Sequence, residues 1–228
     1  MRKLLFHFGR YLILLSKLFV RFESRRVYYQ DTMREAVNIG IGSLVIVFIG
    51  SLFIGAVMTL NTAYQLTSGL FPESVIGSVV SAAALMEFAP TITALLLAGK
   101  VGSHIGSEIG HMRVYEQLDA LEVMGINVPS YLILPKLLGG LIAFPCLVII
   151  SAFLIHLGGI IAGETAEVLN AQEFANGVRM YYDSFQVTFM IIKSFVFGFL
   201  VTTISCYHGF FVKGGPREVG QASTRAVV

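Results

Sequence analysis

The sequence predicts an all-α membrane protein, a polytopic helix bundle with an N-terminal interfacial helix and a cytoplasmic coupling helix. Its composition is 55% hydrophobic and only 13% charged, whereas a soluble domain carries about 25% charged residues. Long apolar runs alternate with charged segments, and the basic residues gather in a few of those segments. The net charge of +2 is unremarkable, and we expect no nucleic-acid partner.

The first segment, residues 1–34, is predicted to be an amphipathic helix in the cytoplasmic interface. Its basic residues recur at intervals of seven, seven, four and four, which places them in one narrow stripe on a helix. They are Lys3, Arg10, Lys17, Arg21 and Arg25. Leu and Phe residues fill the other faces, a pattern typical of a helix lying in the headgroup region. The alternative, a short extra span, would place several arginines in hydrocarbon.

Residues 35–228 are predicted to form the transmembrane domain. The spans lie at about 40–62, 74–99, 131–163 and 185–207, and each is long enough to cross the bilayer as a helix of about 20 residues. The third run is too long for one upright helix, so we expect its start to be tilted or bent near Pro135 and Pro145.

The distribution of Lys and Arg predicts the orientation of these spans. Eight of the sixteen precede residue 35, three lie from Lys100 to Lys136, and three follow Phe211. The loops around 61–73 and 164–184 contain only Arg179. By the positive-inside tendency, both ends and the 100–130 segment are cytoplasmic, and the 164–184 segment is periplasmic.

A stripe of small residues runs from the second span into the cytoplasmic segment. Its members recur at four-residue spacing, which allows another backbone to approach closely. They are Ala94, Ala98, Gly102, Gly106 and Gly110. The stripe indicates either tight packing within the bundle or a subunit contact, and the sequence leaves both alternatives open.

The cytoplasmic segment 100–130 is predicted to contain a short amphipathic helix. Its apolar face consists of Val114, Leu118, Leu121 and Met124, and acidic residues lie elsewhere on it. Gly125 and Pro129 provide a stop signal. Such a helix suits a groove on a soluble partner. The alternative is a solvated loop helix on lipid headgroups, which its acidic residues disfavour beside an anionic leaflet.

Glu87 is the most informative single residue. It lies near the middle of the second span, three residues before Pro90, whose missing amide loosens the helix. A carboxyl at membrane depth is costly and faces a bundle interior or cavity, although a hydrogen bond within the bundle would also explain it. Lys193 is the basic residue at comparable depth in the fourth span. We hypothesise that the two approach each other or face one polar cavity.

Several chemistries lack their sequence signatures. No phosphate-binding loop is present, because Gly99-Lys100 is followed by Val101 and Ala94 stands where the first glycine should be. No nucleophile–histidine arrangement stands out, and His156 has no second ligand at metal spacing. Cys146 and Cys206 lie in apolar runs, so we expect no disulfide. We therefore expect neither catalysis nor a metal or cofactor in this chain.

At these residues the chain resembles the MlaE family of ABC-transporter permeases. The similarity runs from about residue 30 to the end. The matching motifs are Glu87-Phe-Ala-Pro90, Ala98-Gly-Lys-Val-Gly102, Ser107-Glu-Ile-Gly-His-Met-Arg113, Glu116-Gln-Leu-Asp-Ala-Leu121, Met124-Gly125, Leu134-Pro-Lys136, Lys193-Ser194, Phe197-Gly198, Gly214-Gly215 and the run from Val219 to Val228. Two departures stand out: Met86 replaces an arginine common in relatives, and the family pattern usually continues past Val228 into one more span.

The resemblance implies a homodimeric permease in a bacterial inner membrane, or in a related envelope or plastid system. It would move phospholipid between that membrane and a periplasmic MCE-domain protein, maintaining the outer membrane. A separate cytoplasmic ABC ATPase would bind ATP and Mg²⁺, and the family also admits a small STAS-type accessory subunit. Glu87 matches a family glutamate near the lipid cavity between subunits, where we also expect Pro90 and Lys193. The expected ATPase contacts are Glu108, Met112, Arg113, Glu116, Gln117, Asp119, Leu121 and Met124.

Two other classes of function compete with a permease. A proton- or ion-coupled secondary transporter would use Glu87 as its titrating group, but such folds often contain internal repeats and need no acidic docking helix. We find no convincing repeat in the sequence. A purely structural membrane subunit is the third alternative.

Overall fold

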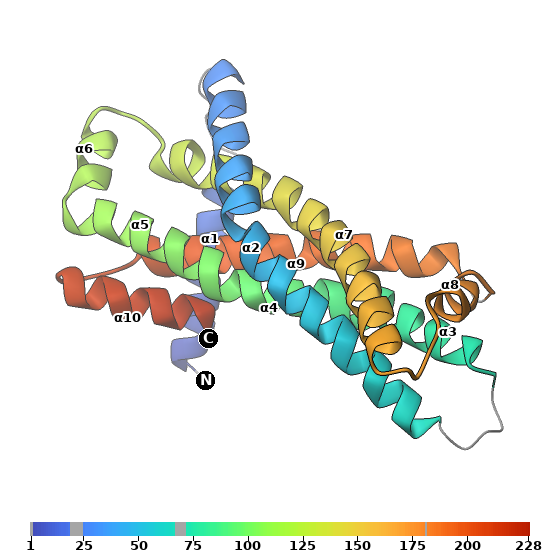
Figure 1. Ribbon diagram of the computed structural model, residues 1–228. Coiled ribbons are helices and arrows are strands. Elements are labelled where there is room, and N and C mark those ends of the chain that lie inside the picture. Colours follow the sequence, from blue (N-terminus) through green and yellow to red (C-terminus); the bar gives the residue numbers. More distant parts are fainter. Residues whose placement is uncertain (1, 19–24, 67–71, 181) are drawn as a thin grey trace. The chain divides into compact units, whose positions relative to one another are not determined.

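The structure, a computed structural model, describes residues 2–18, 25–66, 72–180 and 182–228, and these residues are almost entirely helical (Figure 1). No strand occurs within those ranges. The all-α prediction is therefore confirmed. The first helix, α1, covers Arg2–Lys17, and α2, Arg25–Gln65, opens the membrane domain. Of the predicted basic stripe, Lys17 ends α1, Arg25 begins α2, and Arg21 lies outside the described residues.

The second apolar run forms one long helical stretch with two irregular turns. It consists of α3 (Ser74–Ala83), the π turn η1 (Ala84–Phe88), α4 (Ala89–Leu97), the π turn η2 (Ala98–Gly102) and α5 (Ser103–Val114). A short helix, α6 (Gln117–Val123), follows. Helix therefore continues through Val114, well beyond the predicted end of the span near residue 99.

The second half of the chain contains two more long apolar helices. A π turn, η3 (Pro129–Ile133), leads into α7 (Leu134–Thr165), and the short α8 (Ala171–Met180) connects it to α9 (Ser184–Phe210). The last helix, α10, is Pro216–Val227. The irregular turn η3 lies just before Pro135, which lacks the amide that a regular helix would use there.

Within the part of the chain that the structure describes, four helical stretches are long and apolar enough to cross a membrane, as predicted. They are Tyr28–Gln65, Ser74–Val114, Pro129–Thr165 and Ser184–Phe210. Their surfaces carry many exposed large apolar side chains, such as Phe53 and Phe153, with 68% and 64% of their surface exposed. Exposed aliphatic and aromatic residues on this scale are what lipid contact requires. The chain is therefore a multi-pass membrane protein.

The chain divides into two compact units. One contains Met1–Gly42, Leu97–Ala143 and Gly198–Val228, and the other contains Ser43–Leu96 and Phe144–Phe197. In the first unit, α10 runs beside α5, and in the second unit α3 runs beside α8 (Figure 1). Each of the four long apolar helical stretches contributes residues to both units.

The second unit is held together by close approaches of small residues. The buried face of α2 recurs every four residues, at Ser43, Val47, Ser51, Gly55, Thr59 and Ala63. Ser51 and Ser151 of α7 share a hydrogen bond of 2.7 Å. A Cβ at Gly55 would collide with the Ile155 carbonyl of α7. Small side chains thus bring α2 and α7 into backbone contact, as in other membrane helix pairs.

In the first unit, α1 is anchored on α9 by polar side chains. The ring of His7 hydrogen-bonds the Tyr207 hydroxyl at 2.8 Å, and the hydroxyls of Tyr11 and Thr203 are 2.7 Å apart. The buried Leu14 lies one turn further along α1. Large apolar side chains remain exposed on the rest of this helix, namely Leu5, Phe6, Phe8, Leu12 and Ile13. α1 is thus amphipathic, with one face packed on the protein and apolar residues left for lipid.

Candidate functional site

The predicted cytoplasmic segment 100–130 contains α5 and then the short, exposed helix α6, and we call residues 115–125 the coupling segment. The turn between them places Glu116 in the left-handed region, with φ of 58°, and Gly125 after α6 has φ of 80°. The Arg113 guanidinium donates to Asp119 Oδ1 at 2.6 Å across this turn. Local features therefore fix how the chain enters and leaves α6. They are the left-handed Glu116 and the Arg113–Asp119 ion pair before the helix, and Gly125 after it.

The surface of this segment combines exposed apolar tips with carboxylates. Val123 and Met124 are 89% and 65% exposed, and Tyr115 is also exposed. Among the predicted contact residues, Glu116, Gln117 and Asp119 are exposed, whereas Met112, Arg113 and Leu121 are half-buried. Leu118, from the predicted apolar face, is completely buried and anchors the helix. Met124 of that same face instead points to solvent.

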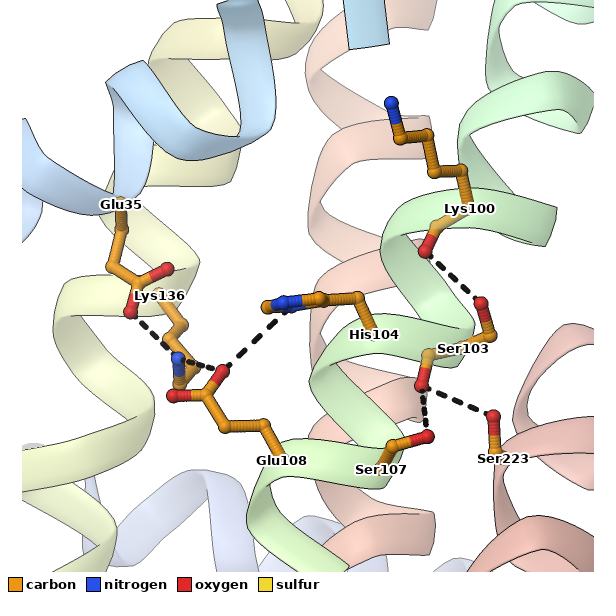
Figure 2. Close-up of polar contacts among 8 residues, drawn as sticks. All are labelled: Glu35, Lys100, Ser103, His104, Ser107, Glu108, Lys136 and Ser223. Carbon is orange, nitrogen blue, oxygen red and sulfur yellow. Dashed lines mark hydrogen bonds and ion pairs between the residues drawn. The ribbon is translucent and has the colours of Figure 1, made fainter. Parts of the chain in front are cut away.

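Glu108, the remaining predicted contact residue, belongs to a charged cluster inside the first unit. The ammonium group of Lys136 donates to Glu108 Oε2 at 2.7 Å and to Glu35 Oε1 at 2.6 Å (Figure 2). His104 Nδ1 lies 3.8 Å from the same Glu108 oxygen. Lys136 is only 1% exposed. One cation thus joins α2, α5 and α7 at the level where α5 leads to the coupling segment.

This cluster was not predicted as a site. In the sequence argument Lys136 served only for membrane orientation and as part of a family motif, and Glu35 had no role. Glu35 and Lys136 are separated by 101 residues in sequence. A buried lysine is rare unless it is paired, so the single cation after Pro135 in an apolar run was the available signal.

A second polar network joins α5 to α10. The hydroxyls of Ser107 and Ser223 both donate to the Ser103 carbonyl, at 2.8 and 3.0 Å (Figure 2). Close by, Gly106 lies against Ser223 and Ala226 of α10, and Gly110 lies against Val219. Gly102 faces Ser205 and Val201 of α9. These three glycines of the predicted stripe therefore pack within the chain, and Ala94 is buried while Ala98 is half-buried.

Glu87 lies in the π turn η1, three residues before Pro90. π turns inside α-helices occur frequently at functional sites. The Glu87 side chain is exposed, whereas Pro90 is buried. Within the described residues no hydrogen bond or ion pair of the Glu87 carboxylate is recorded. Carboxylates within membrane spans generally face a bundle interior or a polar cavity, because lipid does not solvate them.

Lys193 approaches the backbone beside Glu87 rather than its carboxylate. Its ammonium group donates to the Met86 carbonyl at 2.7 Å and lies 4.6 Å from the centre of the Phe189 ring. In a regular helix the amide of residue 90 would donate to that same carbonyl, and Pro90 has no amide hydrogen. Lys193 thus replaces the hydrogen bond that Pro90 removes. Direct pairing of Glu87 with Lys193 stays a hypothesis.

This arrangement predicts that Lys193 and Pro90 are energetically coupled. Changing Lys193 to Met should destabilise the protein by about 1–3 kcal/mol, because the Met86 carbonyl loses its donor inside the bundle. In a chain that also carries Pro90→Ala, the restored amide should make Lys193→Met much less costly. Thermal unfolding of the four variants in detergent measures the coupling. Equal losses in both backgrounds would contradict the assigned role of Lys193.

The remaining titratable candidates have ordinary roles. His156 Nδ1 donates to the Ala152 carbonyl at 2.7 Å, so its Nε2 can accept from the Ser81 hydroxyl at 3.0 Å. It is a satisfied helix histidine, as the sequence indicated. Cys146 and Cys206 are free thiols. Among the described residues, no group of three or more His, Cys, Asp or Glu side chains is arranged to hold a metal ion.

Comparison with known proteins gives consistent matches. A family model described as "Permease MlaE" matches residues 32–228. A "Probable ABC transporter permease protein" of Rickettsia bellii is 35% identical over 202 residues, which cover 89% of this chain and 78% of the relative. A protein of Synechocystis with a similar name is 32% identical over 94% of this chain and 81% of its own length. The "Intermembrane phospholipid transport system permease protein MlaE" of Haemophilus influenzae is 32% identical over 89% of this chain and 78% of its own length.

Proposed function

The chain belongs to the MlaE permease family, and from that membership we propose that it is the permease subunit of an ATP-driven phospholipid transporter. It resides in a bacterial inner membrane with its N-terminus in the cytoplasm. It acts as a homodimer and exchanges phospholipid with a periplasmic MCE-domain protein. ATP and Mg²⁺ bind to a separate cytoplasmic ATPase, and a small STAS-type subunit can join the assembly. This chain carries no catalytic residue in that scheme.

The observation that carries this proposal is the exposed surface of the coupling segment. Exposed carboxylates at Glu116 and Asp119 lie on the same short segment as the exposed apolar side chains of Val123 and Met124. Apolar side chains inside a charged rim are typical of a protein-docking surface. A soluble subunit that changes shape when it hydrolyses nucleotide is the partner that supplies energy to a permease. We therefore assign this surface to the ATPase.

The charged cluster around Lys136 supports a route from that surface into the spans. A push on α6 reaches α5 through the short turn at Glu116, and Glu108 of α5 is tied through Lys136 to α2 and α7. Buried charges that share a cation resist separate movement, since breaking one contact leaves an uncompensated charge. We propose that the helices around Lys136 move together when the ATPase closes, and that the second span then reshapes the lipid cavity near Glu87.

The exposed position of Glu87 supports a lipid site that two copies of the chain complete. Its carboxylate can accept hydrogen bonds from a headgroup such as an ammonium or hydroxyl, while nearby apolar residues contact acyl chains. Lys193 and Pro90 shape the adjacent backbone. In this proposal the Glu87 carboxylate orients the headgroup. Lys193 maintains the irregular turn η1, which positions that carboxylate.

Reconstituted transport tests the proposed function. Vesicles that contain the purified assembly should move labelled phospholipid only when both the ATPase and ATP are present. Movement driven by a proton gradient without the ATPase would instead support a secondary transporter that uses Glu87, the alternative that an unpaired carboxylate in a span favours. No transport under either condition would leave a structural subunit as the better assignment.

Changing Glu87 to Gln is predicted to slow lipid transfer. The amide keeps the shape of the side chain but removes a charge-assisted hydrogen bond, so transfer should fall about tenfold or more. The ATPase should still co-purify, because the coupling segment is unchanged. Glu73→Gln, an exposed carboxyl before α3, is the matched control and should leave transfer unchanged. Normal transfer in the Glu87 variant would exclude a headgroup role.

A further inference from the structure

A basic pocket beside α1 takes no part in the transport scheme above. It has a volume of about 660 Å³ and lies among α1, the end of α9 and α10. Its charged and titratable lining consists of His7, Arg10, His208, Lys213, Glu218 and Arg225. The size is that of a site for a small ligand or a lipid headgroup.

The cations of the basic pocket, Arg10, Lys213 and Arg225, form no ion pair with any residue that the structure describes. The one carboxylate in the lining, Glu218, accepts the Gly215 amide at 2.9 Å and so serves to cap α10. The Arg10 guanidinium stacks on the Phe211 ring at 3.8 Å, which fixes its position at the pocket wall. The pocket therefore offers three cations and two imidazoles to an anion, against the one carboxylate of Glu218.

The helix that contributes Arg10 also carries an exposed apolar surface. Leu5, Phe8 and Leu12 of α1 are about half exposed or more, while His7 and Tyr11 bind α9. A helix with apolar residues exposed on one side and basic residues at its edge lies at the boundary between headgroups and acyl chains. The basic pocket then opens at headgroup level.

We propose that the basic pocket binds the phosphate of an anionic phospholipid in the cytoplasmic leaflet. Arg10 and Arg225 donate to the phosphodiester oxygens, because guanidinium groups match phosphate geometry. Lys213 adds a third positive charge. The acyl chains of that lipid lie along the exposed apolar residues of α1. This site rests on the membrane placement of α1 and is independent of the ATP-driven cycle, so either proposal can fail alone.

Native mass spectrometry of the full chain tests this proposal. The protein is purified in mixed micelles with equal amounts of phosphatidylglycerol and phosphatidylcholine, and the bound lipids are counted. The unaltered chain should retain phosphatidylglycerol preferentially. Arg10→Gln with Arg225→Gln should lower that preference about tenfold, since each cation near an anionic lipid contributes measurably to binding. Lys213→Gln, a change at an exposed position, should lower it by a smaller factor without affecting folding.

Arg217→Gln is the matched control. Arg217 is exposed on the same helix as Arg225 and does not line the pocket, so its loss removes one charge but should leave the lipid ratio unchanged. An equal drop in this control would show that binding follows overall charge rather than this pocket.

Equal retention of both lipids by the unaltered chain would overturn the proposal. Displacement of the lipid by millimolar inorganic phosphate would assign the pocket to free phosphate instead. If the preference for phosphatidylglycerol disappears only when a co-purifying acidic protein is removed, the preference belongs to that protein and not to the pocket.

Discussion

Permease that carries Glu116→Lys together with Asp119→Lys is expected to purify without its ATPase. The two changes reverse the charge of the exposed coupling surface and also remove the Asp119 partner of Arg113. Like charges brought together at an interface raise the free energy of the complex, and so do charges left without partners. We expect binding of the ATPase to weaken by about thirtyfold or more. The fold itself should survive, because an exposed ion pair such as Arg113–Asp119 contributes only about 0–1 kcal/mol to stability. Affinity purification followed by an ATPase assay measures the result.

A double acid-to-base change elsewhere provides the control for this result. Glu164 and Glu173 are exposed residues of α7 and α8, and their change to Lys alters the net charge equally. That control should retain its ATPase. If the Glu116 and Asp119 variant retains a fully active ATPase as well, the coupling surface is not the docking surface.

Lys136→Met is expected to destabilise the chain. It removes the cation that two carboxylates share in the interior of the first unit. Breaking a fully buried ion pair from one side costs about 3–5 kcal/mol. The Glu35 and Glu108 side chains left behind are 19% and 39% exposed, so water offsets part of that cost and the expected loss is about 1–3 kcal/mol. The variant should therefore unfold at a clearly lower temperature in detergent, and lipid transfer should be lost with it.

Two further variants separate a charge effect from a general packing effect. Glu35→Gln and Glu108→Gln added to Lys136→Met remove all three charges, and stability should largely return, since replacing a whole buried ion cluster is often close to neutral. Lys213→Met, at an exposed position, should have little effect. A Lys136 variant as stable as the Lys213 variant would mean that the cluster does not hold α2, α5 and α7 together.

The membrane class and the number of spans followed directly from sequence. Hydrophobic length is a local property, and about 20 consecutive apolar residues can be recognised without knowing their neighbours. The same holds for α6, which the stop signals at Gly125 and Pro129 delimited. The prediction was less informative about which face of α6 is buried. Leu118 is buried, whereas Met124, which lies one residue beyond the end of α6, is exposed.

Partners distant in sequence could not be predicted. The sequence suggested that Lys193 and Glu87 approach each other or face one polar cavity, and that hypothesis remains untested. What the sequence did not indicate is the contact of the Lys193 ammonium group with the Met86 carbonyl. Proline lacks the amide hydrogen that a regular helix would donate to this carbonyl, so the carbonyl oxygen is free to accept another hydrogen bond. Inspection of the sequence does not show which side chain donates to it. The four-residue stripe of small residues in α2 also escaped notice, although its spacing was present in the sequence.

By itself, the sequence determined that this chain spans a membrane several times, that its N-terminal helix is amphipathic, and that an acidic helix interrupts the apolar runs. These properties depend on residue type and short-range spacing alone. Only the tertiary structure decided that Lys136 joins Glu35 and Glu108, and that Lys193 compensates for Pro90. Those contacts depend on how the helices are rotated against each other when they pack. A buried polar group then forms a hydrogen bond with a nearby donor or acceptor, because leaving it unpaired is costly.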